Sequence, residues 1–209
     1  YLSAKAALAE EQDQDAIRLF KALQRAHPDH PRAPEAQLSL AQYFLEQGQI
    51  EEARSQLTTI VDDPSSPSQA ARALYLLGQS ERDRGNLDQA LRYFQRVKSK
   101  YTQTDVAPAA YYAVGATQVQ LERYDSAAAS FEELGQQFPD SPFSQNLGTA
   151  LAEVYYRLDQ YQNAATELQD RLSELEEAQR ARALYLLAES YNQLRNGEEA
   201  VVHYRKVID

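Results

Sequence analysis

Apolar residues recur along the chain with the period of an α-helix, in pairs of short segments separated by glycine or asparagine. Segment 71–102 shows the pattern most clearly. Its apolar positions on the two sides of the break at Gly85-Asn86 are Leu74, Leu77, Leu87, Ala90, Leu91, Phe94 and Val97. Residues spaced by three or four lie on one face of a helix, and glycine or asparagine commonly ends one. The segment therefore predicts a hairpin of two helices.

This hairpin pattern occurs six times, with a period of 37 residues that shortens to 36 at the last step. The small residue that opens each second helix is Ala16, Ala53, Ala90, Ala127, Ala164 and Ala200. Four residues later a large side chain follows, namely Phe20, Leu57, Phe94, Phe131, Leu168 and Tyr204. Twelve residues earlier stands a second small residue, namely Ala4, Ala41, Gly78, Gly115, Ala152 and Ala188. We expect the small residues where two helices approach closely and the large ones in the space beside them.

The predicted helices pair within six repeats, of which the first is incomplete. Their ranges are 2–10 with 13–27, 32–47 with 50–62, 67–84 with 87–101, 105–122 with 124–138, 143–158 with 161–174, and 178–195 with 198–208. The corresponding repeats are 1–30, 31–66, 67–103, 104–141, 142–177 and 178–209. Each hairpin is too small to bury its own apolar face, so neighbouring hairpins must stack.

The spacing of these positions resembles the tetratricopeptide repeat (TPR) pattern, in which Leu-Gly is followed by Ala-x-x-x-Phe. The resemblance implies an all-α fold, a right-handed α-solenoid of TPR helix-turn-helix hairpins that forms a single superhelical domain over residues 1–209. It also implies a protein–protein interaction scaffold that binds a peptide or partner segment in its concave groove. An alternative is a sensing or regulatory TPR arm of a larger enzyme or signalling protein.

The resemblance also implies which side chains line that groove, because TPR proteins use fixed positions of each first helix. These positions are Arg72, Tyr75, Gln79, Arg82, Tyr112, Ala116, Val119, Tyr156, Arg182, Tyr185, Glu189 and Asn192. Tyrosine suits an exposed binding surface because it is large, rigid and able to hydrogen-bond. Alternatively, the tyrosines fill space between adjacent hairpins. The arginines would favour a ligand with acidic or carbonyl-rich segments.

Proline-containing connectors separate three pairs of neighbouring hairpins. They are Pro28-Asp29-His30-Pro31, Pro64-Ser65-Ser66-Pro67 and Pro139-Asp140-Ser141-Pro142. We expect these prolines to end one helix and start the next, although the spacing is also that of a polyproline ligand. The Phe-Pro-Asp-Ser-Pro form resembles connectors of bacterial envelope TPR proteins, such as the Tol–Pal-associated TPR protein and the β-barrel assembly lipoprotein. This resemblance favours a periplasmic or outer-membrane-associated location over a cytoplasmic one.

Composition narrows the range of functions. The net charge of −10, from 31 acidic and 21 basic residues, disfavours nucleic acid as a partner. Cysteine is absent, and no apolar run is long enough to predict direct membrane insertion. No catalytic or phosphate-binding motif is present, so the sequence predicts neither an enzyme nor a cofactor. His27 and His30 flank Asp29, but a solvated loop is favoured over a metal site, which would need further ligands in fixed geometry.

The two ends of the sequence predict that the chain is a fragment of a longer protein. Methionine is absent, and the first hairpin lacks half of its first helix. The last helix ends with apolar residues at Val201, Tyr204, Val207 and Ile208, whereas terminal repeats of such arrays normally present a polar outer face. We therefore expect self-association through the exposed end helices.

Overall fold

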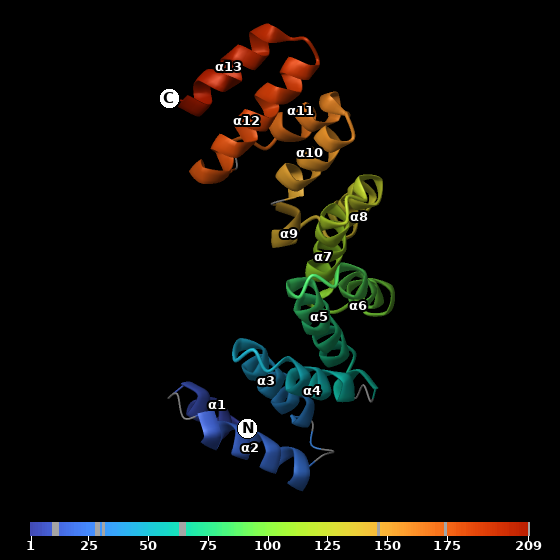
Figure 1. Cartoon of the computed structure of the whole chain (residues 1–209), viewed down its shortest axis with the longest axis vertical. Helices are drawn as coiled ribbons and strands as arrows, with labels where there is room; N and C mark the ends of the chain where they lie inside the picture. The colour runs from blue at the N-terminus through green and yellow to red at the C-terminus, as the bar shows by residue number, and fades with distance from the viewer. Residues whose placement is uncertain are drawn as a thin grey trace. The chain divides into compact units, whose positions relative to one another are not determined.

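A computed structural model describes residues 1–9, 13–27, 30, 32–62, 66–145, 147–173 and 175–208. Within these residues it contains thirteen α-helices and no strand (Figure 1). They are α1 (Leu2–Ala9), α2 (Asp13–Ala26), α3 (Ala33–Glu46), α4 (Ile50–Asp62), α5 (Pro67–Asp83), α6 (Leu87–Lys100), α7 (Ala107–Gln120), α8 (Tyr124–Gln137), α9 (Pro142–Gln145), α10 (Leu147–Arg157), α11 (Tyr161–Gln169), α12 (Glu177–Gln193) and α13 (Gly197–Ile208). The predicted all-α class is confirmed.

The helices group into two compact units, Tyr1–Ala110 and Tyr111–Asp209, with the boundary inside α7. In the first unit α1 packs on α2, α3 on α4 and α5 on α6. In the second unit α10 packs on α11 and α12 on α13, and α10 also contacts α8. These pairs are the predicted hairpins. The single domain over residues 1–209 stays a prediction.

The predicted helix boundaries differ from the observed ones mainly in the fifth repeat. The predicted helix 161–174 ends at Gln169, because the chain turns so that Leu175 can enter the core beside α11 and α12. The guanidinium of Arg180 donates hydrogen bonds to the carbonyls of Leu172 and Leu175, which satisfies backbone groups of this turn. The predicted helix 143–158 corresponds to α9 and α10, with residue 146 between them outside the described residues.

In two of the three connectors, the second proline is the first residue of a helix that the structure describes. Pro67 opens α5, where Ser66 precedes it in extended conformation, and Pro142 opens α9. Proline suits a first helical turn because that position needs no backbone donor. The predictions for Pro28, Asp29, Pro31, Pro64 and Ser65 lie outside the described residues.

One residue in the turn of each of the last five hairpins adopts the left-handed backbone conformation. These residues are Gly48, Gly85, Glu122, Asp159 and Arg195, with φ of 69°, 79°, 57°, 59° and 58°. They are one repeat apart, so each hairpin uses the same turn. The sequence predicted the breaks at Gly48 and Gly85-Asn86, but in the last hairpin the left-handed residue is Arg195 rather than a residue of Asn196-Gly197.

The repeated small residues lie where the two helices of a hairpin meet. The six aligned alanines and their six partners twelve residues earlier are all buried. In the third and fourth hairpins the approach leaves no room for a Cβ atom, because one on Gly78 or Gly115 would lie 2.5 Å from Cε1 of Phe94 or Phe131, respectively. The large residue therefore fills the space that its small partner leaves, as the sequence predicted.

A buried carboxylate joins the second and third hairpins. Glu81 of α5 is only 3% exposed. It accepts a hydrogen bond from Arg54 of α4 and another, 2.7 Å long, from Nδ2 of Asn86. Nη1 of Arg84 lies 3.7 Å from the same carboxylate. This cluster contributes specific polar contacts to an otherwise apolar contact between hairpins.

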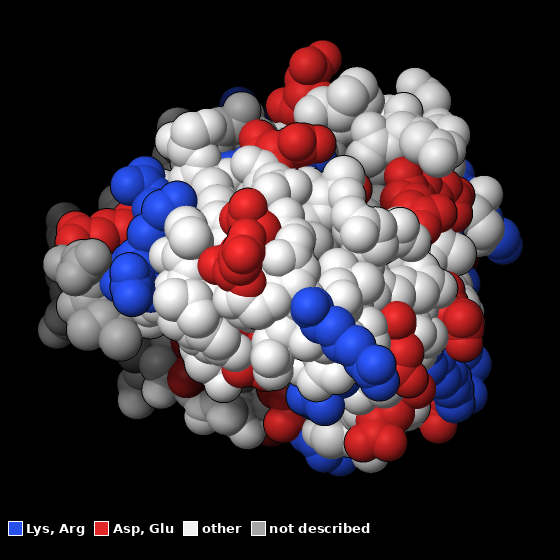
Figure 2. Space-filling view, turned by 90° about the horizontal axis from the view of Figure 1, so that it is seen from above, with Lys and Arg blue, Asp and Glu red and all other residues white. Residues whose placement is uncertain are grey.

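The acidic side chains do not form one continuous patch on the face of the molecule shown in Figure 2. In Figure 2 uncharged residues occupy most of the visible surface, and acidic and basic side chains lie scattered over it. Several opposite charges also form pairs, including Arg18 with Asp15 at 2.9 Å and Arg182 with Glu153 at 2.5 Å.

Candidate partner-binding surface

Ten of the twelve predicted groove residues line three hollows in the structure, one in the first unit and two in the second. The hollows have volumes of about 590 Å³ in the first unit and about 390 and 360 Å³ in the second. The ten residues are Arg72, Tyr75, Gln79, Tyr112, Ala116, Val119, Tyr156, Arg182, Tyr185 and Glu189. Arg82 and Asn192 line none of these three. That these side chains bind a partner stays a prediction.

The hollow of the first unit lies mainly between α3 and α5. It includes Gln42 of α3 and Gln79 of α5, which stand at the same position of consecutive repeats. Arg72 donates a hydrogen bond to Asp105, which also accepts one of 3.0 Å from Ser68. The bond from Arg72 holds the pKa of the Asp105 carboxyl below its ordinary value. The charge of Arg72 is thus already balanced within the chain.

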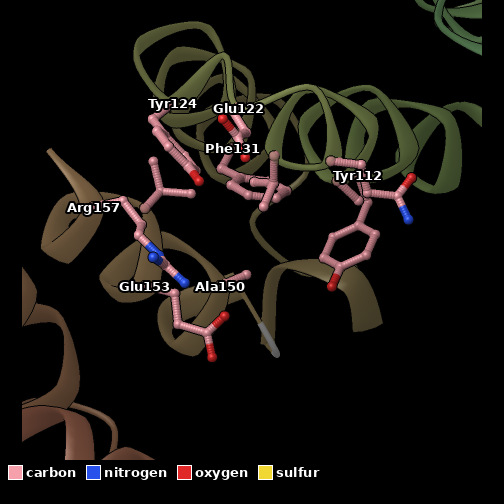
Figure 3. Close-up of a pocket in the computed structure, with 11 residues that line it drawn as sticks. Tyr112, Glu122, Tyr124, Phe131, Ala150, Glu153 and Arg157 are labelled. Atoms are coloured by element: carbon pink, nitrogen blue, oxygen red, sulfur yellow. The ribbon is translucent and has the colours of Figure 1, made fainter. Parts of the chain in front are cut away.

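One hollow of the second unit lies between the α7–α8 hairpin and α10. Figure 3 shows the rings of Tyr112, Tyr124 and Phe131 on one side of it, and Glu153 and Arg157 of α10 on the other. The remaining lining residues are Ala116, Val119, Gln120, Glu122, Ala150 and Val154. Aromatic and aliphatic side chains therefore form its walls, and charged side chains stand among them.

The fourth repeat has a small residue at one position that lines this hollow. Ala116 occupies the position that holds Gln42, Gln79, Glu153 and Glu189 in the other repeats from the second to the sixth. Residues at this position line all three hollows, and the methyl group of Ala116 takes up less of the space than a glutamine or glutamate side chain would.

The other hollow of this unit lies between α10 and α12, and four of its seven lining residues are charged, namely Glu153, Arg157, Arg182 and Glu189. Arg182 of α12 pairs with Glu153 of α10 at 2.5 Å, and Tyr204 donates a hydrogen bond to Glu189. Burial, together with this bond to Glu189, raises the pKa of Tyr204 to about 12. Polar groups of this hollow are therefore largely engaged with one another.

The predicted groove tyrosines pack on rings of their own hairpins. Tyr75 lies against Phe94, Tyr112 against Phe131 and Tyr185 against Tyr204, with centroids 5.6, 5.5 and 6.1 Å apart. The residues of each pair are 19 positions apart, as are Tyr1 and Phe20 at 6.3 Å. Where the second helix carries Leu57 or Leu168, the first-helix position holds Leu38 or Thr149. Tyr75 and Tyr112 thus belong partly to the core and partly to the surface, whereas Tyr185 is exposed.

Several lining residues were not predicted from the sequence. They include Glu35, Leu38, Ser39 and Gln42 of α3 in the first unit, and Glu122, Tyr124, Phe131 and Arg157 in the second. The α3 residues could have been found by applying the 37-residue offset to the second repeat, since Leu38 corresponds to Tyr75 and Gln42 to Gln79. No comparable signal marks Glu122 or Arg157.

The histidines form no metal site with other residues that the structure describes. Nδ1 of His30 accepts a hydrogen bond of 3.1 Å from the backbone N–H of Arg32, and Asp29 lies outside the described residues. Among described residues, no group of three or more His, Cys, Asp or Glu side chains is placed to hold a metal ion.

His203 lies on the buried side of α13. Its ring stacks on Tyr191 with centroids 5.6 Å apart and planes within 9°. Nε2 lies 3.7 Å from Glu199, and Nδ1 is buried without a hydrogen-bond partner in the described part of the chain. Burial lowers the pKa of His203 below its ordinary value of 6.5, as does Lys206, whereas Glu199 raises it.

This lowered pKa predicts a stability that depends on pH. The unfolded chain takes up a proton at His203 near pH 6.5, while the folded chain resists protonation until lower pH. The contribution of His203 is therefore fully present above 6.5 and is lost as the pH falls below it. Thermal melts about one unit above and below this value should differ more for the natural chain than for His203→Phe. An unchanged difference would contradict the prediction, and His27→Phe, at an exposed position, is the control.

The described fold defines an α-helical repeat protein built of short hairpins. A family model described as tetratricopeptide repeat matches residues 1–68, 38–103, 75–142 and 149–209. The chain therefore belongs to the tetratricopeptide repeat family, and the predicted α-solenoid fold is confirmed. TPR arrays are typically non-catalytic scaffolds that bind proteins, so the partners of this chain are proteins. None of the helices in the described ranges is both long and apolar enough to cross a membrane.

Solved structures share this fold at low sequence identity. BtubC from P. vanneervenii is 16% identical with a TM-score of 0.74, and the match covers 95% of this chain and 89% of that one. A tetratricopeptide repeat protein from Parabacteroides merdae is 16% identical with a TM-score of 0.70, covering 99% and 76%. MamA from Desulfovibrio magneticus RS-1 is 18% identical with a TM-score of 0.66, covering 84% and 93%. No curated protein matches the chain by sequence.

Proposed function

We propose that the chain is a scaffold that binds a partner segment along the surface formed by its first helices, and that the hollow at Ala116 receives an apolar side chain of that segment. The lining of this hollow carries the proposal. It combines the rings of Tyr112 and Phe131 with the aliphatic side chains of Val119 and Val154. Buried apolar contact of this kind supplies much of the binding energy at protein interfaces.

Ion pairs within the chain support selection by apolar contact rather than by charge. Arg72 is paired with Asp105, and Arg182 with Glu153. An acidic ligand would therefore meet arginines whose charge an acidic residue of the chain already partly balances. The arginines therefore add less attraction for acidic segments than their number in the sequence suggests.

The most direct test of this proposal fills the Ala116 hollow with a larger side chain. In Ala116→Gln the fourth repeat acquires the residue that the second and third repeats carry at this position. Short peptides selected from a random display library against the natural chain should share a large apolar residue. Their affinity for Ala116→Gln should fall about tenfold or more, equivalent to about 1.4 kcal/mol, as measured by calorimetry.

The control is Ala129→Gln, the same substitution at an exposed position of α8 in the same hairpin. It should leave peptide affinity unchanged. Equal binding by Ala116→Gln and the natural chain would show that the hollow is not used. Tyr112→Ala is less informative, because Tyr112 also packs on Phe131 and on Phe143 at 5.8 Å and its loss would affect folding.

The bacterial envelope is the location that we propose for this scaffold. Its support is the connector at residues 138–142, which resembles those of envelope TPR proteins. In this connector Ser144 donates a hydrogen bond of 2.6 Å to the carbonyl of Phe138, and Phe138 packs on Tyr111 at 5.2 Å. Fractionation of source cells with an antibody against the chain tests the location, and recovery from the cytoplasm alone would contradict it.

A further inference from the structure

The turn between α12 and α13 contains the dipeptide Asn196-Gly197. Of the five asparagines in the sequence, Asn196 alone is followed by glycine, whereas leucine, alanine or glutamine follows the others. The backbone nitrogen of a residue can attack the side chain of an asparagine that precedes it. Glycine favours this ring closure, because it has no Cβ atom to crowd the reacting groups and its backbone is conformationally free. The sequence therefore distinguishes Asn196 from the other asparagines.

The turn itself exposes this dipeptide to solvent. Asn196 is exposed, and so are the residues at its position in the second to fifth repeats, each of which is followed by another hairpin, namely Gln49, Asn86, Arg123 and Gln160. A Cβ atom at Gly197 would have no heavy atom within 4 Å, so the space around its backbone is open as well.

At the same position of the third hairpin, hydrogen bonds hold both of the groups that would react. Nδ2 of Asn86 donates a hydrogen bond of 2.7 Å to Glu81. The backbone N–H of Leu87 donates one of 2.9 Å to the carbonyl of Gly85. The side-chain amide and the backbone nitrogen that follows it are therefore both engaged in this turn.

Both groups are free in the turn at Asn196. Neither Nδ2 of Asn196 nor the backbone N–H of Gly197 donates a hydrogen bond within the described residues. An N–H at the first position of a helix has no acceptor in its own helix. Oδ1 of Asn196 accepts a bond from the backbone N–H of Glu199, but at 3.4 Å this bond is longer than usual. The side chain is thus only weakly held.

We propose that Asn196 is a site of spontaneous deamidation. The backbone nitrogen of Gly197 loses its proton and bonds to Cγ of Asn196, the bond from Cγ to Nδ2 breaks, and ammonia leaves. Water then opens the resulting five-membered imide at one of its two carbonyls. Opening at one carbonyl gives aspartate. Opening at the other gives isoaspartate, in which the backbone runs through Cβ and Cγ of residue 196.

The two products differ in their effect on α13. Aspartate leaves the backbone unchanged and adds a negative charge at the start of the helix, where the peptide dipoles favour it. Isoaspartate takes the carbonyl of residue 196 out of the backbone. In the natural chain that carbonyl accepts a hydrogen bond of 3.1 Å from the backbone N–H of Ala200. The isoaspartate form should therefore destabilise the first turn of α13.

Peptide mapping by mass spectrometry tests the site after the purified 209-residue chain has been incubated at physiological temperature. Residue 196 should be converted to a mixture of aspartate and isoaspartate faster than any other asparagine. Gly197→Leu copies the Asn86-Leu87 pair of the third hairpin and should slow this conversion about tenfold or more. Conversion at residue 196 no faster than elsewhere would overturn the proposal, as would an unchanged rate in Gly197→Leu.

Leu87→Gly is the matched control, because it creates a second Asn-Gly pair where Nδ2 of Asn86 is bonded to Glu81. Residue 86 should still react more slowly than residue 196, and equal rates would overturn the structural basis of the proposal.

The effect on α13 is tested by separating the aged chain into its forms. The isoaspartate form should melt at a lower temperature than Asn196→Asp, whereas equal melting temperatures would overturn the expected loss at the first turn. These outcomes are independent of peptide binding at the Ala116 hollow.

Discussion

Arg54→Ala should lower the free energy of unfolding by about 2–3 kcal/mol. The substitution removes a hydrogen-bond donor to Glu81, whose side chain is almost fully buried. The carboxylate then keeps only its hydrogen bond from Asn86 and its ion pair with Arg84. The expected loss in the free energy of unfolding is smaller than the largest losses seen when a fully buried ion pair is broken. The reason is that the side chain of Arg54 is 35% exposed. Chemical denaturation monitored by circular dichroism measures this change.

The preceding repeat of the chain suggests a double substitution that should restore the stability lost in Arg54→Ala. One repeat earlier, the positions of Arg54 and Glu81 are occupied by Ile17 and Phe44, which pack in an apolar cluster. The double variant Arg54→Ile/Glu81→Phe should therefore recover most of the stability, since a packed apolar pair can replace a buried ion pair. A loss below about 0.5 kcal/mol for Arg54→Ala, the level typical of surface changes, would mean that the cluster contributes little.

Gly78→Ala should destabilise the chain by up to about 2 kcal/mol, although alanine is the better helix former. Its Cβ atom would lie 2.5 Å from Cε1 of Phe94, a ring that is fully buried and cannot move without disturbing its neighbours. Such overpacking costs about 1–3 kcal/mol, and the gain in helix propensity offsets about 1 kcal/mol of it. Thermal and denaturant unfolding both report the difference.

Two further variants separate the effect of steric overlap with Phe94 from the effect of helix propensity. Phe94→Leu in the Gly78→Ala background copies the pairs Ala41 with Leu57 and Ala152 with Leu168, and should restore much of the loss. Gly135→Ala should instead stabilise by about 0.5–1 kcal/mol, because its Cβ would meet Cδ2 of Leu147 at an ordinary 3.4 Å. If Gly78→Ala stabilised the chain as Gly135→Ala does, helix propensity rather than close packing would govern this position.

The sequence predicted the helices and their contacts well because these depend on local period and residue size. Ala90, Gly78 and Phe94 keep fixed offsets in a hairpin, so their shared contact can be read from one repeat and checked in five others. The turn at Gly85 was predicted from residue type. The equivalent turns at Glu122 and Asp159 follow only from the repeat period, since neither residue is a typical helix terminator.

Features that depend on two different repeats were not predicted. The burial of Glu81 requires Arg54 from the preceding hairpin, and the neutralisation of Arg72 requires Asp105 from the following one. Neither partner can be recognised from periodicity, because exposed charged residues are common at such positions. For the same reason the sequence overestimated the free positive charge at the predicted groove positions.

Under the proposed function, Phe131 limits how the binding specificity of this chain can evolve. One part of its ring packs against Gly115 in the core of the hairpin, and the same residue forms a wall of the Ala116 hollow. A mutation of Phe131 that suited a new partner would therefore also damage the fold. Variation among descendants of this protein should concentrate at Ala116, Val119 and Ala150, which line the hollow without filling the contact between the two helices. Specificity can then diverge while the hairpin stays intact.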